Sequence, residues 1–479
     1  MNRVFLVPLI VACALFMENL DSTVLATALP AIAQSLDVNP LTLNLAITAY
    51  LLSLAVFIPV SGWVADRFGA RQVFRLAIAV FVLGSIGCGL SQDLWQLVGA
   101  RILQGAGGAM MIPVGRLVIL RSVPKHQLVQ ALAYLTVPAL IGPILGPPLG
   151  GFITTYFDWR WIFWINLPIG ILGIWLATRY IPDLKEESVP RLDGLGFLLS
   201  AVALAGLVFG CQALGRDLLP DWLVASLLGG GALAVACYLL HARRTAAPLL
   251  DLGLLRLPTF RASVLGGLLF RIGIGALPFL LPLMLQLGFG YTALESGLTT
   301  FVAAIGAITM KIAAAPILRR LGFKFVLIGN AIVSGIFLAA VGLFTSATPE
   351  VLMLAVLLMG GFFRSLQFTS LNAIAYAQVE RPRMSAATSL ASMMQQLSLS
   401  IGVGIGAMTL HFTLTAAGRT LPAAGDFALA FGVVGAAAAL SALAFLRLPH
   451  DAGSEISGRV KLRQGVASNA TTVKDAAAE

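Results

Sequence analysis

GWVADRFGAR, residues 62–71, is a short basic turn between two apolar runs of the chain. Its centre has the form R-x-G-x-[RK], and the same form returns as RLGFK at 320–324, again after a long apolar run. A second pair, RILQ at 101–104 and RSLQ at 364–367, lies two apolar runs further along in each case. Two matches in the same order predict two related halves, an arrangement found in secondary transporters.

The composition requires a membrane protein. Of 479 residues, 58% are hydrophobic and only 11% charged, whereas soluble domains carry about 25% charged residues. Hydropathy windows of about 19 residues predict an all-α polytopic membrane protein with fourteen transmembrane helices. The expected spans lie near 4–30, 41–65, 72–90, 94–119, 128–155, 160–181, 193–213, 219–240, 261–288, 296–318, 324–345, 350–376, 385–412 and 426–447.

Grouping these spans predicts two six-helix halves with two extra helices between them. The boundaries that we expect are 1–185 for the N-terminal half, 186–245 for the inserted helices, 246–449 for the C-terminal half and 450–479 for a polar cytoplasmic tail. The tail shows no periodicity, so we expect it to be disordered.

The positive charge reports orientation. The net charge is +10, and Lys and Arg concentrate in the cytoplasmic loops of membrane proteins. With both termini cytoplasmic, the outside loops contain only Arg160, Arg216 and Arg419 as basic residues. The charge therefore indicates topology, and we expect no nucleic-acid partner.

Charged residues inside the spans are the sharpest functional signal, because each costs at least about 2.5 kcal/mol at the centre of a membrane helix. Arg116 lies near a helix end, where its side chain could reach the headgroup region. The seven residues are Glu18, Asp21, Arg101, Arg116, Arg271, Lys311 and Arg364, with a net charge of +3.

The first-span carboxylates suggest proton transport. Counting along helices of opposite direction places Asp21 and Arg101 at one depth, and Glu18 lies one turn from Asp21 on the same face. Two close carboxylates in a low dielectric cannot both remain ionised at low cost. Our hypothesis is that Asp21, assisted by Glu18 and modulated by Arg101, carries a proton. The alternative is a purely structural Asp–Arg pair.

The second half contributes three intramembrane cations, Arg271, Lys311 and Arg364, and no intramembrane acid. An anionic substrate could neutralise them. Alternatively, they contact headgroups or backbone carbonyls at helix ends. Gln286 and Gln395 could add hydrogen bonds to a substrate in the same cavity.

Glycines mark two places of close helix packing. Gly62 and Gly69 flank Asp66, whose carboxylate could accept from a neighbouring helix or a basic side chain and latch the cytoplasmic side; a generic tight loop is the alternative. GPILGPPLGG at 142–151 contains overlapping GxxxG units and helix-bending prolines, and the alternative for it is a tight helix pair without a mechanistic role.

These motifs together resemble one family. The loop at 62–71 resembles the signature of the major facilitator superfamily, and ARILQGAGGAMMIPVGR at 100–116 resembles its fourth-helix motif. ENLDSTVLATALP at 18–30 and WRWIFWINLPIG at 159–170 are similar to the fourteen-span drug:proton antiporters of the EmrB/QacA-like branch, and FRIGIGALPFLLP at 270–282 to its MdtD-like members.

The resemblance implies the major facilitator fold and proton-coupled antiport by alternating access. It implies a cytoplasmic gate loop containing Gly62, Asp66, Arg67, Gly69 and Arg71. It also implies an antiporter helix motif, linked in the family to export by exchange, containing Gly142, Pro143, Gly146, Pro147, Gly150 and Gly151.

The expected function is therefore transport. The chain lacks HExxH, GxSxG and GxxxxGK[ST] motifs, so we expect no enzyme activity, no catalytic residues, no metal and no cofactor, with the proton gradient as energy source. The expected partners are protons, the lipid bilayer and a small molecule. Multidrug efflux of lipophilic drugs is the first hypothesis and export of organic anions, such as carboxylated metabolites, the alternative. By analogy with the family we expect a monomer in a bacterial inner membrane.

Overall fold

A computed structural model describes residues 3–38, 44–182, 185, 189–214, 219–419 and 422–457, and all regular structure in these ranges is helical. The first half contains α1 Arg3–Ser35, α2 Asn44–Phe57, α3 Ser61–Phe68, α4 Ala70–Leu90, α5 Leu94–Ser122, α6 Leu128–Tyr156, α7 Trp161–Trp164 and α8 Asn166–Tyr180. The inserted pair is α9 Gly194–Ala213 and α10 Asp221–Arg244. The second half contains α11 Pro258–Arg261, α12 Gly267–Gly275, α13 Leu277–Leu283, α14 Ala293–Leu321, α15 Phe323–Val341, α16 Glu350–Ile374, α17 Met384–Ala416, α18 Phe427–Phe445 and the short α19 Ser454–Ser457.

The number of membrane-crossing helices agrees with the predicted fold class. Thirteen segments of the described chain are long and apolar enough to cross a membrane. The helix α6, with 29 residues, supplies the fourteenth. The protein is thus an all-α, multi-pass membrane protein, and the predicted span edges lie within a few residues of the helix ends.

Two spans are interrupted where proline and glycine occur. The second crosses through α2, the 3₁₀ turn η1 Ile58–Val60 and α3, and Pro59 lies at the start of that turn. The ninth consists of α11, the π-helical turn η4 Ala262–Gly266, α12, α13 and a second π-helical turn, η5 Met284–Gly288. Proline removes a backbone donor and disturbs the preceding turn, so such breaks are expected there.

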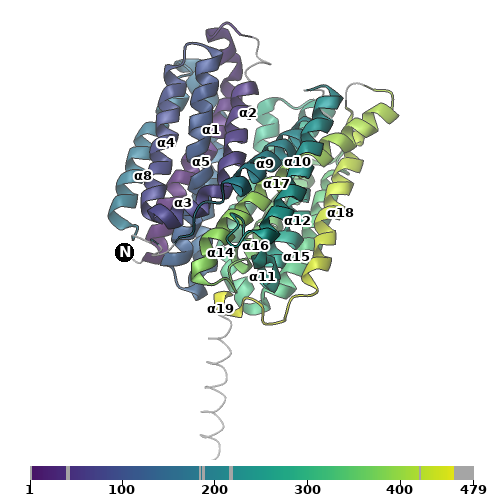
Figure 1. Cartoon of the computed structure of the whole chain (residues 1–479). Coiled ribbons are helices and arrows are strands. Elements are labelled where there is room, and N and C mark those ends of the chain that lie inside the picture. Colours follow the sequence, from purple (N-terminus) through teal and green to yellow (C-terminus); the bar gives the residue numbers. More distant parts are fainter. Residues whose placement is uncertain are drawn as a thin grey trace, which may run out of the picture.

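The two groups of helices lie side by side, with α9 and α10 near the join (Figure 1). Within the first group α1 packs against α6 and α4 against α5; in the second, α14 packs against α16 and α15 against α18. The groups meet where α14 contacts α6 and where α17 contacts α3 and α5. The helix α9 packs against its partner α10 and also contacts α2 and α17.

The repeated turn has one backbone geometry in both halves. Gly69 links α3 to α4 with φ of 91°, and Gly322 links α14 to α15 with φ of 81°. Both values lie in the region that favours glycine, because a side chain would clash with the backbone there. The two R-x-G-x-[RK] stretches therefore make equivalent tight turns.

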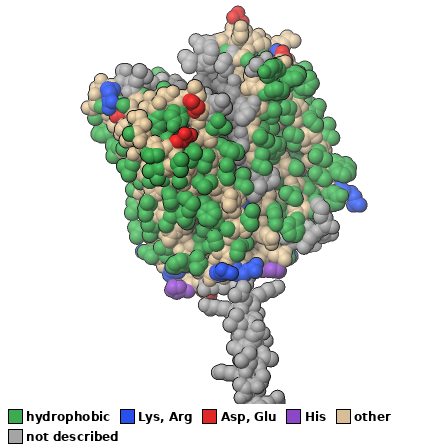
Figure 2. Space-filling model, turned by 180° about the vertical axis from the view of Figure 1, so that it is seen from behind, with side chains coloured by type: hydrophobic (Ala, Val, Ile, Leu, Met, Phe, Trp, Pro, Cys, Tyr) green, Lys and Arg blue, Asp and Glu red, His purple; other side chains and the backbone are tan. Residues whose placement is uncertain are grey.

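The outer surface matches a membrane environment. Figure 2 shows a broad band of hydrophobic side chains, with Lys, Arg and His side chains along the lower end of the molecule and other basic side chains at the upper left and right edges. Many large apolar residues in this chain are exposed, including Leu83 at 58% and Ile312 at 82%. Such residues would contact lipid rather than water.

Asp193 ties the inserted helices to the segment that follows them. It caps α9 by accepting from the N–H of Gly196 at 2.8 Å, and it also accepts from the N–H of Leu249 at 3.2 Å. His241, near the end of α10, places Nε2 2.8 Å from Asp193 Oδ1. Burial opposes ionisation of this carboxyl, but these hydrogen bonds outweigh it, so the pKa of Asp193 lies below its ordinary value.

The predicted tail begins with structure rather than disorder. The helix α19 lies within it and buries Ile456 completely. Residues 458–479 of that tail lie outside the described residues, as do Arg216 and the side chains of Pro143 and Pro147.

Candidate functional site

The carboxylate of Asp21 is the centre of a buried polar network in the first half. Arg101 Nη1 donates to Asp21 Oδ2 at 2.6 Å, and both side chains are 1% exposed. Gln104 Nε2 and Asn166 Nδ2 each donate to Asp21 Oδ1 at 2.9 Å. These donors come from α5 and α8, so Asp21 links three helices and its charge is well compensated.

The surrounding side chains hold these donors in place. Arg101 Nη1 also donates to Gln104 Oε1 at 2.6 Å, and its guanidinium lies 4.3 Å from the ring centroid of Tyr50. Asn166 Nδ2 contacts Ser85 Oγ at 2.9 Å. A network with this many shared partners fixes the rotamers of its members.

Glu18, one turn before Asp21, has a different environment. The residue is 6% exposed, and its Oε2 is buried with no hydrogen-bond partner among the described residues. The hydroxyl of Tyr50 is also buried, and it interacts with the Glu18 carboxyl. Both groups border Gly108: a Cβ built there would lie 3.2 Å from the Tyr50 hydroxyl and 3.5 Å from Glu18 Oε1. The two α1 carboxylates are thus unequal: Asp21 accepts from three side-chain donors, whereas one oxygen of Glu18 has no donor within hydrogen-bonding distance among the described residues.

The glycines of α6 bring α1 close to it. A Cβ on Gly142 would lie 3.0 Å from the backbone of α1, and one on Gly146 would clash with Thr23 Oγ1. Gly151, by contrast, faces open space, and the Gly150 carbonyl accepts from Thr154 within the same helix. The first part of the predicted motif therefore packs against the helix that carries Glu18 and Asp21.

The loop at 62–71 connects the two halves at one membrane face. Asp66 accepts from Arg121 Nη2 of α5 at 3.0 Å and from the hydroxyl of Ser385 on α17. The backbone N–H of Gly62 donates to Ser389 Oγ at 2.8 Å, and a Cβ on Gly62 would lie 2.7 Å from the Ser385 carbonyl oxygen. Arg67 is exposed, and Arg71 is half-buried. These contacts join the loop to α17 of the second half, with Gly62 packed against that helix; the latch role remains a prediction.

Further contacts hold the halves together at the same face. Lys125 Nζ donates to the carbonyl oxygen of Ala377 at 3.4 Å. Arg116 Nη1 lies 3.5 Å from the Tyr376 hydroxyl. Arg116 is only 6% exposed, so it points into the protein and does not reach the headgroup region.

Arg116 and Lys311 line one small cavity between the halves, together with Leu132, Leu135, Thr369 and Asn372. Arg116 and the two leucines belong to the first half, and the remaining three residues to α14 and α16. Lys311 Nζ donates to Thr369 Oγ1 at 2.6 Å. Neither cation forms an ion pair with a described carboxylate, and the cavity lining contains no acidic residue. The cavity is only about 10 Å³, space for about one water molecule, so it marks a place where two cations approach each other between the halves and is too small to hold a substrate in this conformation.

The other predicted cavity residues lie in separate environments. Arg271 is buried, donates to the Ser263 carbonyl oxygen at 3.1 Å and lies 5.9 Å from the Phe368 ring centroid. Arg364 is half-buried on α16. Gln395 buries its Oε1 without a partner among the described residues, whereas Gln286 is exposed in η5. Only Lys311 of the five predicted residues therefore lines the cavity that also contains Arg116.

Sequence reasoning missed several of these partners. Gln104 and Asn166 lie inside the quoted motifs at 100–116 and 159–170, which were the available signal. Thr369, Ser385 and Ser389 carried no signal, because serine and threonine are common on membrane helices.

Fold and site together define a class: helical membrane transporters in which two halves meet around buried charges. The sequence model of the Major Facilitator Superfamily matches residues 11–403 and, in a second match, 263–476. The chain belongs to the major facilitator superfamily, whose members transport small molecules and are not enzymes.

Sequence relatives agree with this assignment. The chain is 42% identical over 407 residues to the putative multidrug resistance protein MdtD of Salmonella heidelberg, covering 84% of this chain and 85% of the relative. Identity to the protein of the same name from Salmonella typhimurium is 41% over the same length. The predicted resemblance to MdtD-like members is confirmed.

Solved structures share the fold at low identity. The proton:xylose symporter XylE matches with a TM-score of 0.67 and 16% identity, covering 96% of this chain and 98% of that chain. The human organic anion transporter MFSD10 matches with a TM-score of 0.64 and 15% identity, covering 92% and 98%. These similarities support the architecture alone.

Proposed function

We propose that this protein is a proton-coupled antiporter of a bacterial inner membrane, with both termini cytoplasmic, which exports lipophilic drugs by alternating access. The names of its relatives support the substrate class. The buried carboxylate pair of α1 carries the proposal of proton coupling, because an acidic residue at this depth requires a task or a partner. No cofactor enters the scheme.

The geometry favours unequal roles for the two carboxylates. Asp21 accepts from Arg101, Gln104 and Asn166 and therefore suits the ionised form. Glu18 has a buried oxygen without a partner, so binding a proton there removes an uncompensated charge. In the proposed cycle Glu18, rather than Asp21 as the sequence suggested, holds the proton, and Asp21 and Arg101 set how readily that proton is released.

Packing couples this site to the change of access. The helix α1 is held against α6 through Gly142 and Gly146, and α6 also contacts α14 of the second half. When the halves rock, the contact of α6 with α14 would pull on α6 and, through the glycine contacts, on α1 within the first half. A displacement of α1 against α5 and α8 would rearrange the donors around Asp21 and change the field at Glu18.

The test compares Glu18→Gln with Asp21→Asn in reconstituted vesicles. We expect Glu18→Gln to abolish export driven by a pH gradient while substrate exchange without a gradient persists. Asp21→Asn should impair both and lower the Tm, because three donors lose a charged acceptor. Asp37→Asn, which changes an exposed carboxylate beyond the end of the same helix, is the matched control. Full gradient-driven export by Glu18→Gln would refute the assignment.

One observation favours a second candidate, the export of organic anions. Arg116, Arg271, Lys311 and Arg364 form no ion pair with a described carboxylate, and two of them share one cavity. Lipophilic cations would be repelled by such a lining, whereas a carboxylate would be attracted.

A thermal-shift panel separates the two substrate classes. Purified protein would be incubated with lipophilic cations or with small carboxylates, using wild type, Lys311→Ala, Arg364→Ala and the exposed control Arg319→Ala on the helix that carries Lys311. Drug export predicts stabilisation by the lipophilic cations. Anion export would be the better proposal if only the carboxylates stabilise the protein. That stabilisation should then be lost in Lys311→Ala and retained in Arg319→Ala.

A further inference from the structure

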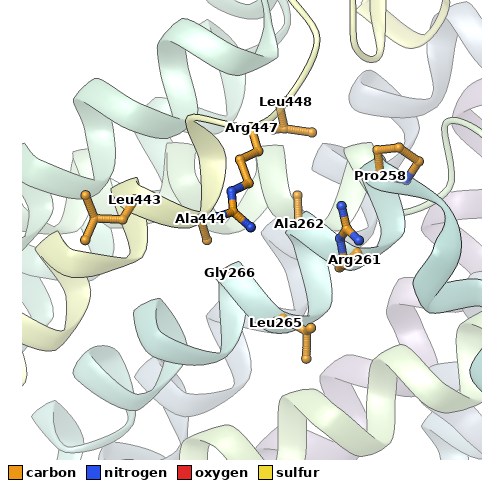
Figure 3. Close-up of a pocket in the computed structure, with 9 residues that line it drawn as sticks. All are labelled: Pro258, Arg261, Ala262, Leu265, Gly266, Leu443, Ala444, Arg447 and Leu448. Atoms are coloured by element: carbon orange, nitrogen blue, oxygen red, sulfur yellow. The ribbon is translucent and has the colours of Figure 1, made fainter.

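A groove that shares no lining residue with the cavity of Arg116 and Lys311 lies where the start of the ninth span meets the end of α18. Its volume is about 350 Å³, and nine residues line it (Figure 3). Gly266 shapes it: a Cβ built there would lie 2.7 Å from the Phe445 ring and 2.9 Å from the Ala444 side chain. The two chain segments therefore touch at Gly266 and leave space beside it.

Two arginines border this groove. Arg261 ends α11, and Arg447 follows α18 by two residues. Figure 3 shows the Arg447 side chain reaching from its own helix towards the opposite segment, with the guanidinium of Arg261 on the other side of Ala262. Both residues are exposed, and neither forms an ion pair with a described carboxylate. None of the nine lining residues is acidic, so the lining carries two uncompensated positive charges.

The groove also lies at the edge of the membrane. The span 258–288 begins three residues before Arg261, and the span that contains α18 ends at Phe445. Leu265 and Leu443, each four residues nearer the membrane centre than the neighbouring arginine, are 46% and 61% exposed. One helical turn, about 5.4 Å, therefore separates a cationic rim from an apolar wall that faces lipid.

We propose that this groove binds an anionic phospholipid. Arg261 and Arg447 would donate to the headgroup phosphate, and an acyl chain would lie along Leu265 and Leu443. Guanidinium groups bind phosphate through strong charge-assisted hydrogen bonds, and basic pockets between helices at the cytoplasmic face are suited to acidic headgroups. A free phosphate ester would interact only with the two arginines and would leave the apolar wall uncovered. The apolar wall therefore favours a lipid as the source of the phosphate.

The test measures lipid binding to the purified, delipidated, full-length protein in a neutral detergent. The probes are phosphatidylglycerol, phosphatidylcholine and soluble glycerol 3-phosphate, and bound lipid is read by native mass spectrometry alongside the shift in Tm. Wild type is compared with Arg261→Ala/Arg447→Ala. The control, Arg243→Ala/Arg244→Ala, removes two exposed arginines from the end of α10, at the same membrane face.

We expect wild type and control to retain phosphatidylglycerol, and the groove variant to bind it at least about tenfold more weakly. Phosphatidylcholine and glycerol 3-phosphate should bind weakly to all three proteins. Equal phosphatidylglycerol binding by groove variant and control would overturn the proposal. Tight binding of glycerol 3-phosphate would overturn the lipid as the occupant. If the double variant does not fold, Arg447→Glu provides the same comparison, with repulsion of the headgroup as its expected effect.

Discussion

Asp21 shows how a single buried charge organises part of a membrane protein. Its two oxygens accept from Arg101, Gln104 and Asn166, which lie on α5 and α8. Each hydrogen bond to an ionised group contributes about 1.5 to 3 kcal/mol. The Asp21 carboxylate therefore fixes the orientation of these three side chains, and they fix its orientation in turn. Glu18, one turn away, has one buried oxygen without a hydrogen-bond partner among the described residues.

The change Asn166→Ala removes one of these bonds, together with the contact of Asn166 with Ser85. Losing the donor at 2.9 Å from Asp21 should destabilise the protein by about 1.5 to 3 kcal/mol and shift the pH dependence of export. Both effects are measurable, as the Tm in detergent and as export rates across a series of pH values. Asn330→Ala is the control, because Asn330 donates to the neutral oxygens of Phe363 and Gln367 in the second half. An unchanged pH profile in Asn166→Ala would contradict a role in proton coupling.

Sequence could predict depth in the membrane but not rotation about a helix axis. Asp21 and Arg101 were placed at one level by counting residues, and they do pair. Gln104 lies one turn from Arg101 on the same face of α5, but whether that face turns towards α1 depends on the rotation of α5 about its axis, which counting residues does not provide. The sequence suggested that the Arg116 side chain could reach the headgroups from its helix end. It instead points inward, where it lines the cavity beside Lys311 and contacts the Tyr376 hydroxyl.

At the scale of elements, the inserted pair α9 and α10 is fixed by one residue outside the spans. Asp193 begins α9 and holds both His241 near the end of α10 and the N–H of Leu249 beyond it. Its pKa lies below the ordinary value, so the folded state favours its ionised form. Three attachments to one carboxylate keep the start of α9 and the end of α10 together.

The contribution of Asp193 to the free energy of unfolding should depend on pH. Because the folded pKa of Asp193 is lowered, its contribution is fully present above the unfolded value of about 4 and is lost as the pH falls through the folded pKa. Asp193→Ala should lower the free energy of unfolding by about 1 kcal/mol at neutral pH, as for loss of a helix cap, and by less in acid. The Tm measured between pH 3 and 7 tests this. The difference in Tm between wild type and Asp193→Ala should therefore shrink as the pH falls. Asp221→Ala, in the exposed first turn of α10, is the control and should show no such change with pH.

For the whole molecule, the main result is that the halves are joined at one face by specific contacts. The composition and the repeated motifs were enough to predict fourteen spans and the fold class. Contacts between halves could not be predicted, because Ser385 and Ser389 lie more than 300 residues from the loop that they contact. In a transporter that alternates access, these contacts must break in every cycle.

A cross-link across this face tests that requirement. The hydroxyl oxygens of Ser61 and Ser389 lie 3.0 Å apart, so a pair of cysteines there could reach the disulfide bond length of about 2.05 Å with a small shift. In a background without the four native cysteines, Ser61→Cys/Ser389→Cys should form a disulfide on oxidation and lose export, and a reductant should restore it. Each single variant should keep its activity under oxidant. If the fully cross-linked protein exported at the normal rate, this face would stay closed during transport. The requirement that these contacts break in every cycle would then be wrong.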